Sequence, residues 1–244
     1  MSQPDYGSSG RYGIGTPQAN PTVEPEFSIL MPRTASLHAV RLTSLQEKSE
    51  DRLCEYLESV SDYLERFDRL QLSAFGFACT ASSYLLGQKT EDKILSRLRR
   101  SYDIFTATQA IDWTLKKLTA KRILIAAPYP KTIREAGYDY WTNAGYDVRE
   151  ILHIETTSTD TRSIYELQSQ DAIAMLESSN LDDVDAVLLS GTGMPSLKAL
   201  ALDWPVPVVS SNLCLAARMM DGREPLDGIF PQGWRERLAQ ATVT

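Results

Sequence analysis

Residues 74–87 read AFGFACTASSYLLG and give the clearest indication of the fold. The first five of these residues form a short apolar run typical of a buried strand, and the residues after Cys79 begin a helical pattern. Further apolar runs predict strands at 12–16, 122–127, 186–190 and 206–210. Amphipathic stretches between them predict helices at 44–67, 107–118, 163–176 and 196–201. Strands that alternate with helices are typical of parallel sheets covered by helices, so the sequence predicts an α/β protein.

The predicted strand ends recur along the chain at a nearly constant spacing. Cys79 follows Pro17 by 62 residues, and Gly191 follows Pro128 by 63. This spacing indicates a duplication, with two facing halves whose carboxyl strand ends meet in one cleft. We expect a flexible tail at 1–10, a first half at 11–110, a second half at 111–220 and a C-terminal extension at 221–244. The boundary near 110 is approximate, because the last helix of the first half can cross over.

Composition excludes several classes of function. The 244 residues include 25 Lys and Arg against 32 Asp and Glu, a net charge of −7 that disfavours binding to nucleic acid. The longest apolar runs are far shorter than the roughly 18 residues needed to span a membrane. The N-terminal residues lack the pattern of a signal peptide. Three cysteines without C-x-x-C spacing and two histidines predict neither a disulfide framework nor a metal site. We therefore expect a cytoplasmic protein with no nucleic-acid or membrane partner.

Cys79 is the candidate catalytic residue. It stands where a strand should pass into a helix, and unpaired N–H groups at a helix N-terminus lower the pKa of a thiol. A thiol in that place suits a nucleophile or a proton donor. The alternative is a small buried residue that ends a strand, since free cysteine is often buried.

Other polar residues follow the remaining strand ends. Hydroxyls such as those of Thr80 and Thr192 could cap helices or, together with N–H groups, bind a carboxylate. Tyr129 lies between two prolines, which would hold its ring in a fixed direction for a hydrogen bond or for packing. Asn20 precedes a proline and could form an Asx-turn or direct its amide into the cleft.

Four motifs resemble those of the aspartate/glutamate racemase superfamily, in its maleate isomerase and arylmalonate decarboxylase branch. The resemblance covers about residues 11–220. None of the motifs is specific alone, but all four occur in order at the right spacing. They are Gly15-Thr-Pro-Gln-Ala-Asn20-Pro-Thr-Val-Glu24, Cys79-Thr80-Ala-Ser-Ser-Tyr-Leu-Leu-Gly87, Ala127-Pro128-Tyr129 and Leu188-Leu-Ser-Gly191-Thr-Gly193.

The resemblance implies two Rossmann-like (flavodoxin-like) parallel-sheet halves related by a pseudo-two-fold axis, with the active site in the cleft between them. It also implies no metal, no cofactor, a small dicarboxylate substrate and a homo-oligomer (dimer or tetramer). Racemases of this type use one cysteine from each half, whereas this chain has Gly191 where the second is expected. The resemblance assigns catalysis to Cys79. It assigns substrate binding to Asn20, Thr80, Ala81, Tyr129, Gly191, Thr192 and Gly193.

A single thiol is compatible with two reactions. In a maleate isomerase-like reaction, Cys79 adds to the alkene, the C–C bond rotates, and elimination gives fumarate. In an arylmalonate decarboxylase-like reaction, Cys79 instead protonates the enediolate left after loss of carbon dioxide. The isomerase is our leading hypothesis, because both Asn20 and Cys79 match that type. A third possibility, from a different class, is a non-catalytic module that binds dicarboxylates.

Overall fold

The first sheet contains four parallel strands. The structure, a computed structural model, describes residues 5–241, so the first four residues of the predicted tail lie outside the described part. The sheet has the order β2-β1-β3-β4. Its strands are β1 (Arg11–Pro17), β2 (Ser36–Leu42), β3 (Ala74–Phe77) and β4 (Ile104–Thr106).

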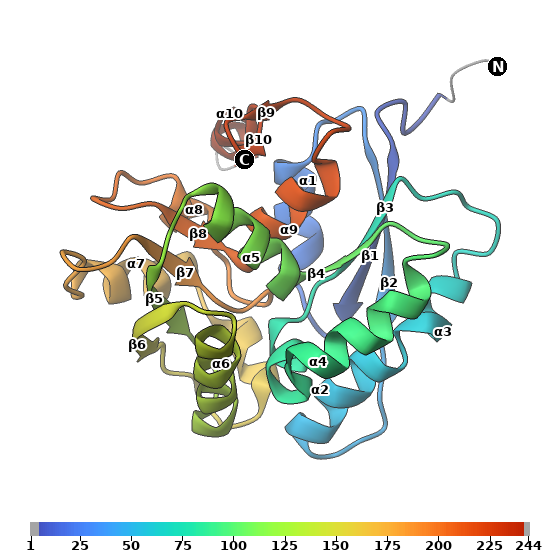
Figure 1. The fold of residues 1–244 in the computed structure, drawn as a ribbon. Helices are drawn as coiled ribbons and strands as arrows, with labels where there is room; N and C mark the ends of the chain where they lie inside the picture. The colour runs from blue at the N-terminus through green and yellow to red at the C-terminus, as the bar shows by residue number, and fades with distance from the viewer. Residues whose placement is uncertain (1–4, 242–244) are drawn as a thin grey trace.

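The second sheet repeats this arrangement, with the order β6-β5-β7-β8. Its strands are β5 (Arg122–Ala127), β6 (Asp147–His153), β7 (Ala186–Leu189) and β8 (Val208–Ser210). Each sheet places its first strand beside its second and third, and all neighbouring strands within both sheets are parallel. The predicted α/β class with two parallel-sheet halves is therefore confirmed (Figure 1). The division of the chain at 110/111 stays a proposal.

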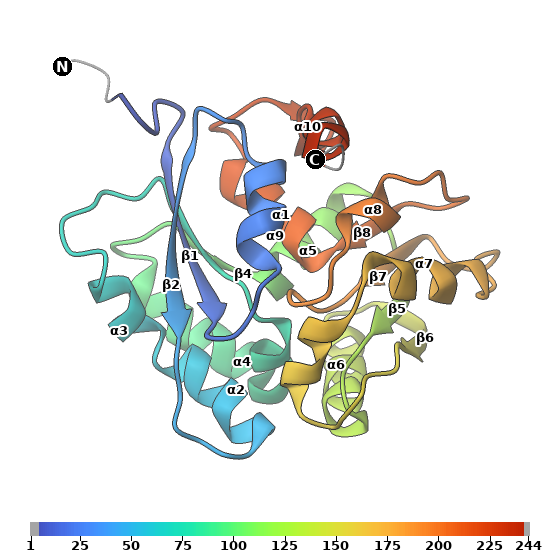
Figure 2. The same cartoon turned by 180° about the vertical axis from the view of Figure 1, so that it is seen from behind.

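Helices surround both sheets (Figure 2). Those that follow first-sheet strands are α1 (Val23–Leu30), α2 (Ser49–Glu58), α3 (Val60–Glu65), α4 (Thr80–Leu98) and α5 (Ala107–Lys117). Those associated with the second sheet are α6 (Lys131–Asn143), the 3-10 helix η1 (Thr161–Glu166), α7 (Ser169–Glu177), α8 (Leu197–Leu200) and α9 (Ser211–Met220). The remaining C-terminal elements are β9 (Leu226–Asp227), β10 (Phe230–Pro231) and α10 (Trp234–Ala241). None of the helices in the described part of the chain is long and apolar enough to cross a membrane.

The predicted elements occur with some differences. All five predicted strands are present, within two residues at each end. The helix expected at 44–67 begins only at Ser49 and is interrupted at Ser59, where α2 gives way to α3. The helix expected at 163–176 is divided into η1 and α7. These changes shorten the helices but leave the strand ends where the sequence placed them.

The two halves interlock through α9, which follows the last strand of the second sheet and packs on the first. Gly76 of β3 has no room for a side chain, because a Cβ there would lie 2.5 Å from Sδ of Met219 on α9. Helices α4 and α6 also meet across the halves, and the Tyr140 hydroxyl donates a 2.6 Å hydrogen bond to the buried carboxylate of Glu91. The core is therefore continuous from one sheet to the other.

Candidate active site

A small cavity of about 30 Å³ lies where strand ends of the two sheets meet. Seven of the eight residues predicted for the site line it, and the eighth, Thr80, contacts one of the seven. The structure thus brings the predicted residues together, although their roles stay a proposal. The lining consists of Pro17, Asn20, Leu53, Cys79, Ala81, Tyr129, Thr161, Ile164, Tyr165, Gly191, Thr192 and Gly193.

Cys79 directly precedes α4 and occupies the N-cap position of that helix. Its Sγ accepts a hydrogen bond from the hydroxyl of Ser82 at 3.1 Å. The backbone N–H groups of Ala81 and Ser82 also favour the thiolate. These donors are the unpaired groups of the first helical turn, and they fix the sulfur at the cavity.

The expected low pKa of Cys79 is wrong in direction. Burial raises the pKa of the thiol above its usual value of 9.0, and the hydrogen bonds from Ser82 and Ala81 oppose this shift without reversing it. Only 4% of Cys79 is exposed, so the thiolate loses most of its hydration. Burial, which the sequence offered as the alternative interpretation of Cys79, therefore outweighs the effect of the helix N-terminus on the pKa.

Tyr129 directly follows Pro128, just beyond the end of β5, and reaches across to the first half. Its hydroxyl lies 2.6 Å from Oγ1 of Thr80, the first residue of α4. Its ring packs edge-on against Tyr84, with centroids 6.3 Å apart. Burial raises the pKa of Tyr129 well above 10, and the nearby Cys79 adds to the shift. The phenol is therefore neutral and can donate a hydrogen bond.

Gly191 takes the place expected for a second cysteine. Its φ of +139° belongs to the region that favours glycine. A Cβ at this position would lie 3.3 Å from Cδ of Pro128 and 3.6 Å from the hydroxyl oxygen of Tyr129. The space beside Gly191 is thus filled by the loop that follows β5.

Thr192 and Asn20 connect the halves at the cavity. The Thr192 hydroxyl donates to the carbonyl oxygen of Ala78, and the Asn20 Nδ2 lies 3.4 Å from the same hydroxyl. The Asn20 Oδ1 accepts hydrogen bonds from the N–H groups of Thr22 and Val23, where α1 begins. The Asn20 side chain therefore matches both interpretations. Its Oδ1 forms the Asx-turn, and its Nδ2 faces the cleft.

Glu26 supports this loop from behind. Its buried carboxylate accepts hydrogen bonds from the backbone N–H groups of Ser196 and Leu197 and from the Asn212 Nδ2. The same Asn212 nitrogen donates to the carbonyl oxygen of Thr192 at 3.1 Å. Burial raises the pKa of Glu26, and these hydrogen bonds oppose the shift. Glu26 thereby fixes the 191–193 loop against α1, a role that no local sequence pattern indicates.

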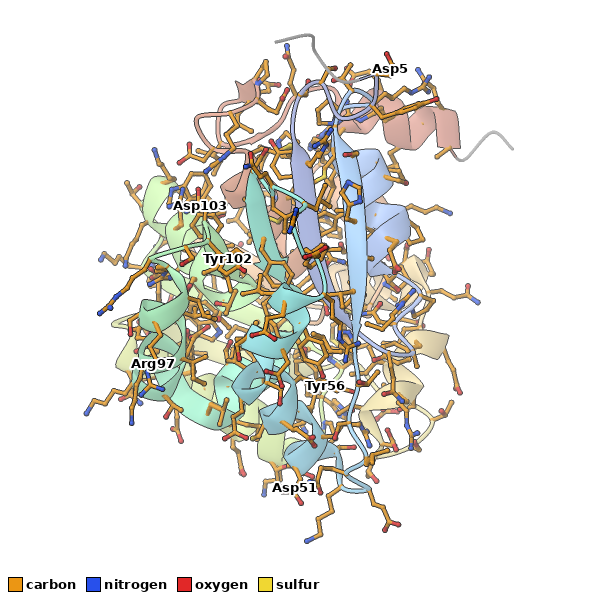
Figure 3. All side chains as sticks on the ribbon, turned by 90° about the vertical axis from the view of Figure 1, so that its right-hand side faces the viewer. Asp5, Asp51, Tyr56, Arg97, Tyr102 and Asp103 are labelled. Carbon is orange, nitrogen blue, oxygen red and sulfur yellow. The ribbon has the colours of Figure 1, made fainter. Side chains whose placement is uncertain are left out.

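One wall of the cavity is formed by residues that are not among the eight predicted for the site. Leu53 comes from α2, which Figure 3 marks by Asp51 and Tyr56 at the lower end of the first sheet. Ile164 and Tyr165 come from η1, at the start of the segment 163–176 for which the sequence predicts only a helix. Their packing depends on contacts between distant parts of the chain, so no local pattern marks them.

An ion pair holds this wall closed. The buried guanidinium of Arg52 on α2 lies 3.1 Å from Oδ1 of Asp160, immediately before η1. Hydrogen bonds from Arg162 and the charge of Arg52 lower the pKa of Asp160 to about 2. The two halves are therefore joined next to the cavity at any ordinary pH.

The cavity presents neutral donors and no charged side chain among its lining residues. The hydroxyl of Tyr129 and the amide of Asn20 are neutral donors at the cavity that could hold an anion. Within residues 5–241, no group of three or more His, Cys, Asp or Glu side chains could hold a metal ion.

Two facing parallel sheets with strand-end loops that meet at one buried cysteine define an α/β protein of the aspartate/glutamate racemase type. The model of the arylmalonate decarboxylase family matches residues 12–221, so the chain belongs to this family. Maleate isomerases are among the relatives of the chain.

Known proteins agree with this assignment. Maleate isomerase of Alcaligenes faecalis is 25% identical, over 91% of this chain and 98% of the relative. A cysteine-to-alanine variant of the maleate isomerase Iso from Pseudomonas putida S16, solved with maleate, has a TM-score of 0.81 at 22% identity, and covers 90% of this chain and 95% of that one. A cysteine-to-serine variant of Nocardia farcinica maleate cis-trans isomerase, with a covalently bound succinylcysteine intermediate, has a TM-score of 0.74 at 19% identity, over 86% and 91% of the two chains.

Proposed function

We propose that the protein isomerises a small cis-dicarboxylate such as maleate to its trans isomer, with Cys79 as the nucleophile. The observation that carries the proposal is the position of Cys79, which lies in a cavity beside Asn20 and Tyr129 and is held by donors of the first turn of α4. The similarity to maleate isomerases along nine-tenths of the chain supports it.

The reaction requires few groups. The Cys79 thiolate adds to one alkene carbon, and the electron pair moves to the neighbouring carbon and its carboxylate. The former double bond is then single and rotates, after which the thiolate leaves and the trans alkene forms. Buried N–H and O–H donors stabilise the enediolate more effectively than water does, because they are already oriented. The hydroxyl of Ser82 and the N–H groups of Ala81 and Ser82 stabilise the departing thiolate.

The covalent step has support in a relative. The Nocardia farcinica variant contains a succinylcysteine intermediate although one of its cysteines is replaced by serine. A chain with one cysteine in its cavity can therefore be expected to form the same kind of adduct.

One observation favours decarboxylation of an arylmalonate as a second candidate. Burial raises the pKa of Cys79, so the thiol is protonated at neutral pH. A protonated thiol suits a proton donor better than a nucleophile. In that reaction one carboxylate leaves as carbon dioxide and Cys79 protonates the enediolate that remains.

Proton NMR in D₂O tests both reactions. Purified protein is incubated separately with maleate and with phenylmalonate, beside the variants Cys79→Ala and Cys54→Ala. Cys54 is a matched control, because it lies on α2 and does not line the cavity. We expect fumarate from maleate with the wild type and Cys54→Ala, and none with Cys79→Ala.

Three other outcomes would lead to a different conclusion. A deuterated monoacid from phenylmalonate would establish the decarboxylase instead. Fumarate formed by Cys79→Ala would contradict the mechanism. If neither compound reacts but maleate protects Cys79 from alkylation, the protein is a binding module.

A further inference from the structure

Residue 191 is a glycine, so no thiol at that position can donate or accept a proton. The question is which other group of the second half can do so. A Cβ at Gly191 would lie 3.6 Å from the hydroxyl oxygen of Tyr129. The Tyr129 hydroxyl thus lies within contact distance of the point where a side chain at residue 191 would begin. The two nearer atoms around that point are carbons of the Pro128 ring.

The other hydroxyls at the cavity are less suitable. The Thr192 hydroxyl donates its proton to the carbonyl of Ala78, at 2.8 Å. Tyr165 lies against Gly193 rather than Gly191, since its ring carbon would be 2.6 Å from a Cβ at Gly193.

Tyr129 is also held in one orientation. Its ring meets Tyr84 edge-on, and only 5% of the residue is exposed. Its hydroxyl is 2.6 Å from that of Thr80, and either oxygen can be the donor in that pair. When Thr80 donates, the Tyr129 proton is free to point into the cavity. When Tyr129 has lost its proton, the same Thr80 hydroxyl stabilises the phenolate.

We propose that Tyr129 is the second catalytic residue of this site, an acid and base that acts from the second half in place of a thiol at residue 191. The proposal rests on the proposed isomerase function. It gives Tyr129 a role at the reacting carbon, beyond binding of a carboxylate.

The proton and electron balance closes over one turnover of the molecules in which Cys79 is a thiolate, the minor form at neutral pH. The Cys79 thiolate adds to one alkene carbon, and Tyr129 gives its proton to the neighbouring carbon and becomes a phenolate. The new single bond rotates. The phenolate then takes a hydrogen from that same carbon while the C–S bond breaks, which restores the thiolate and the phenol. The raised pKa of Tyr129 makes its phenolate a strong base, as this last step requires.

This sequence predicts an isotope label. If Cys79 and Tyr129 act on opposite faces, Tyr129 delivers deuterium in D₂O on the face opposite the sulfur. Rotation toward the trans isomer then places the original hydrogen on that face, so the base removes hydrogen and leaves the deuterium behind. Each fumarate should carry one deuterium. A reaction in which the carbanion is never protonated gives fumarate without deuterium.

The experiment measures deuterium per molecule of fumarate, by NMR and mass spectrometry, for the wild type, Tyr129→Phe and Tyr165→Phe. We expect about one deuterium with the wild type and with Tyr165→Phe, which removes the other phenol of the cavity. We expect slow turnover and at least a tenfold lower deuterium content with Tyr129→Phe, because addition and loss of the thiolate need no proton.

Two results would overturn the role of Tyr129 and leave the isomerase intact. These are wild-type fumarate without deuterium, which decides the question even if Tyr129→Phe is inactive, and an undiminished deuterium content in Tyr129→Phe. A wild type that leaves maleate unchanged overturns the proposed function itself, and the role of Tyr129 with it.

Discussion

The hydroxyl of Thr192 donates a hydrogen bond to the main-chain carbonyl of Ala78, the residue before Cys79, at 2.8 Å. One contact thus joins the loop after β7 in the second sheet to the end of β3 in the first. The position of Cys79 and that of the 191–193 loop are therefore not independent.

Replacement of Thr192 by Val should uncouple the two loops. The substitution keeps the shape of the side chain but leaves the buried carbonyl of Ala78 without this donor, which should cost about 1–3 kcal/mol of unfolding free energy. Urea denaturation measures the loss, and KM for maleate should rise. Thr192→Ser keeps the hydroxyl and should restore most of the stability. A Thr192→Val variant as stable as the wild type would show that the hydrogen bond contributes little.

A cysteine introduced at Gly191 should destabilise the protein. The φ of +139° is unfavourable for any residue with a Cβ, and the new Cβ would also press on Pro128. Backbone strain of this kind costs about 1–3 kcal/mol. Gly145→Ala is the control, since Gly145 has φ +91° and open space around it, and so reports the strain without crowding. If Gly191→Cys is as stable as the wild type, the loop can adopt another conformation.

Alkylation of Cys79 should accelerate with pH. Because burial raises its pKa above 9.0, half of the Cys79 thiol should be ionised only at a pH above that value. Iodoacetamide labelling, followed by mass spectrometry in a Cys54→Ala background, measures the rate. The same shift predicts stability that is present below about pH 9 and is lost as the pH rises through the folded-state pKa. A labelling midpoint below 9.0 would show that the helix N-terminus outweighs burial.

Glu26→Ala should destabilise the 191–193 loop, although Glu26 itself does not line the cavity. It leaves the N–H groups of Ser196 and Leu197 and the Asn212 amide without their acceptor, at an expected cost of about 3 kcal/mol in unfolding free energy. Glu24→Ala is the matched control, because that carboxylate lies on the same helix and forms only a partly exposed ion pair with Arg41. Similar melting temperatures for the two variants would contradict the role given to Glu26.

The strands that carry the site could be predicted from sequence, because β3, β5 and β7 contain continuous apolar runs and β1 is buried along most of its length. Strands β2 and β6 give no clear pattern, for a physical reason. Both lie at sheet edges, and their mixed polar and apolar residues reflect partial exposure. Strand β4 has only three residues, too few for a clear pattern.

The site itself was predictable only in part. Residues at strand ends, such as Cys79 and Thr192, follow from topology, since parallel strands collect their carboxyl ends at one edge. Leu53 and Tyr165 reach the cavity through tertiary packing, and nothing beside them in the sequence indicates it. The direction of the pKa shift of Cys79 could not be predicted for the same reason. The burial that raises this pKa depends on the whole fold, whereas a helix N-terminus is a local feature.

The packing of α9 on β3 has a consequence for how the chain can be divided. Met219 covers Gly76 so closely that the first sheet would expose an apolar face if the chain ended before α9. The second sheet, expressed alone, would leave the same helix without its partner. Neither half should therefore survive as a separate fragment, and a chain cut near residue 110 should regain its structure only when both pieces are mixed.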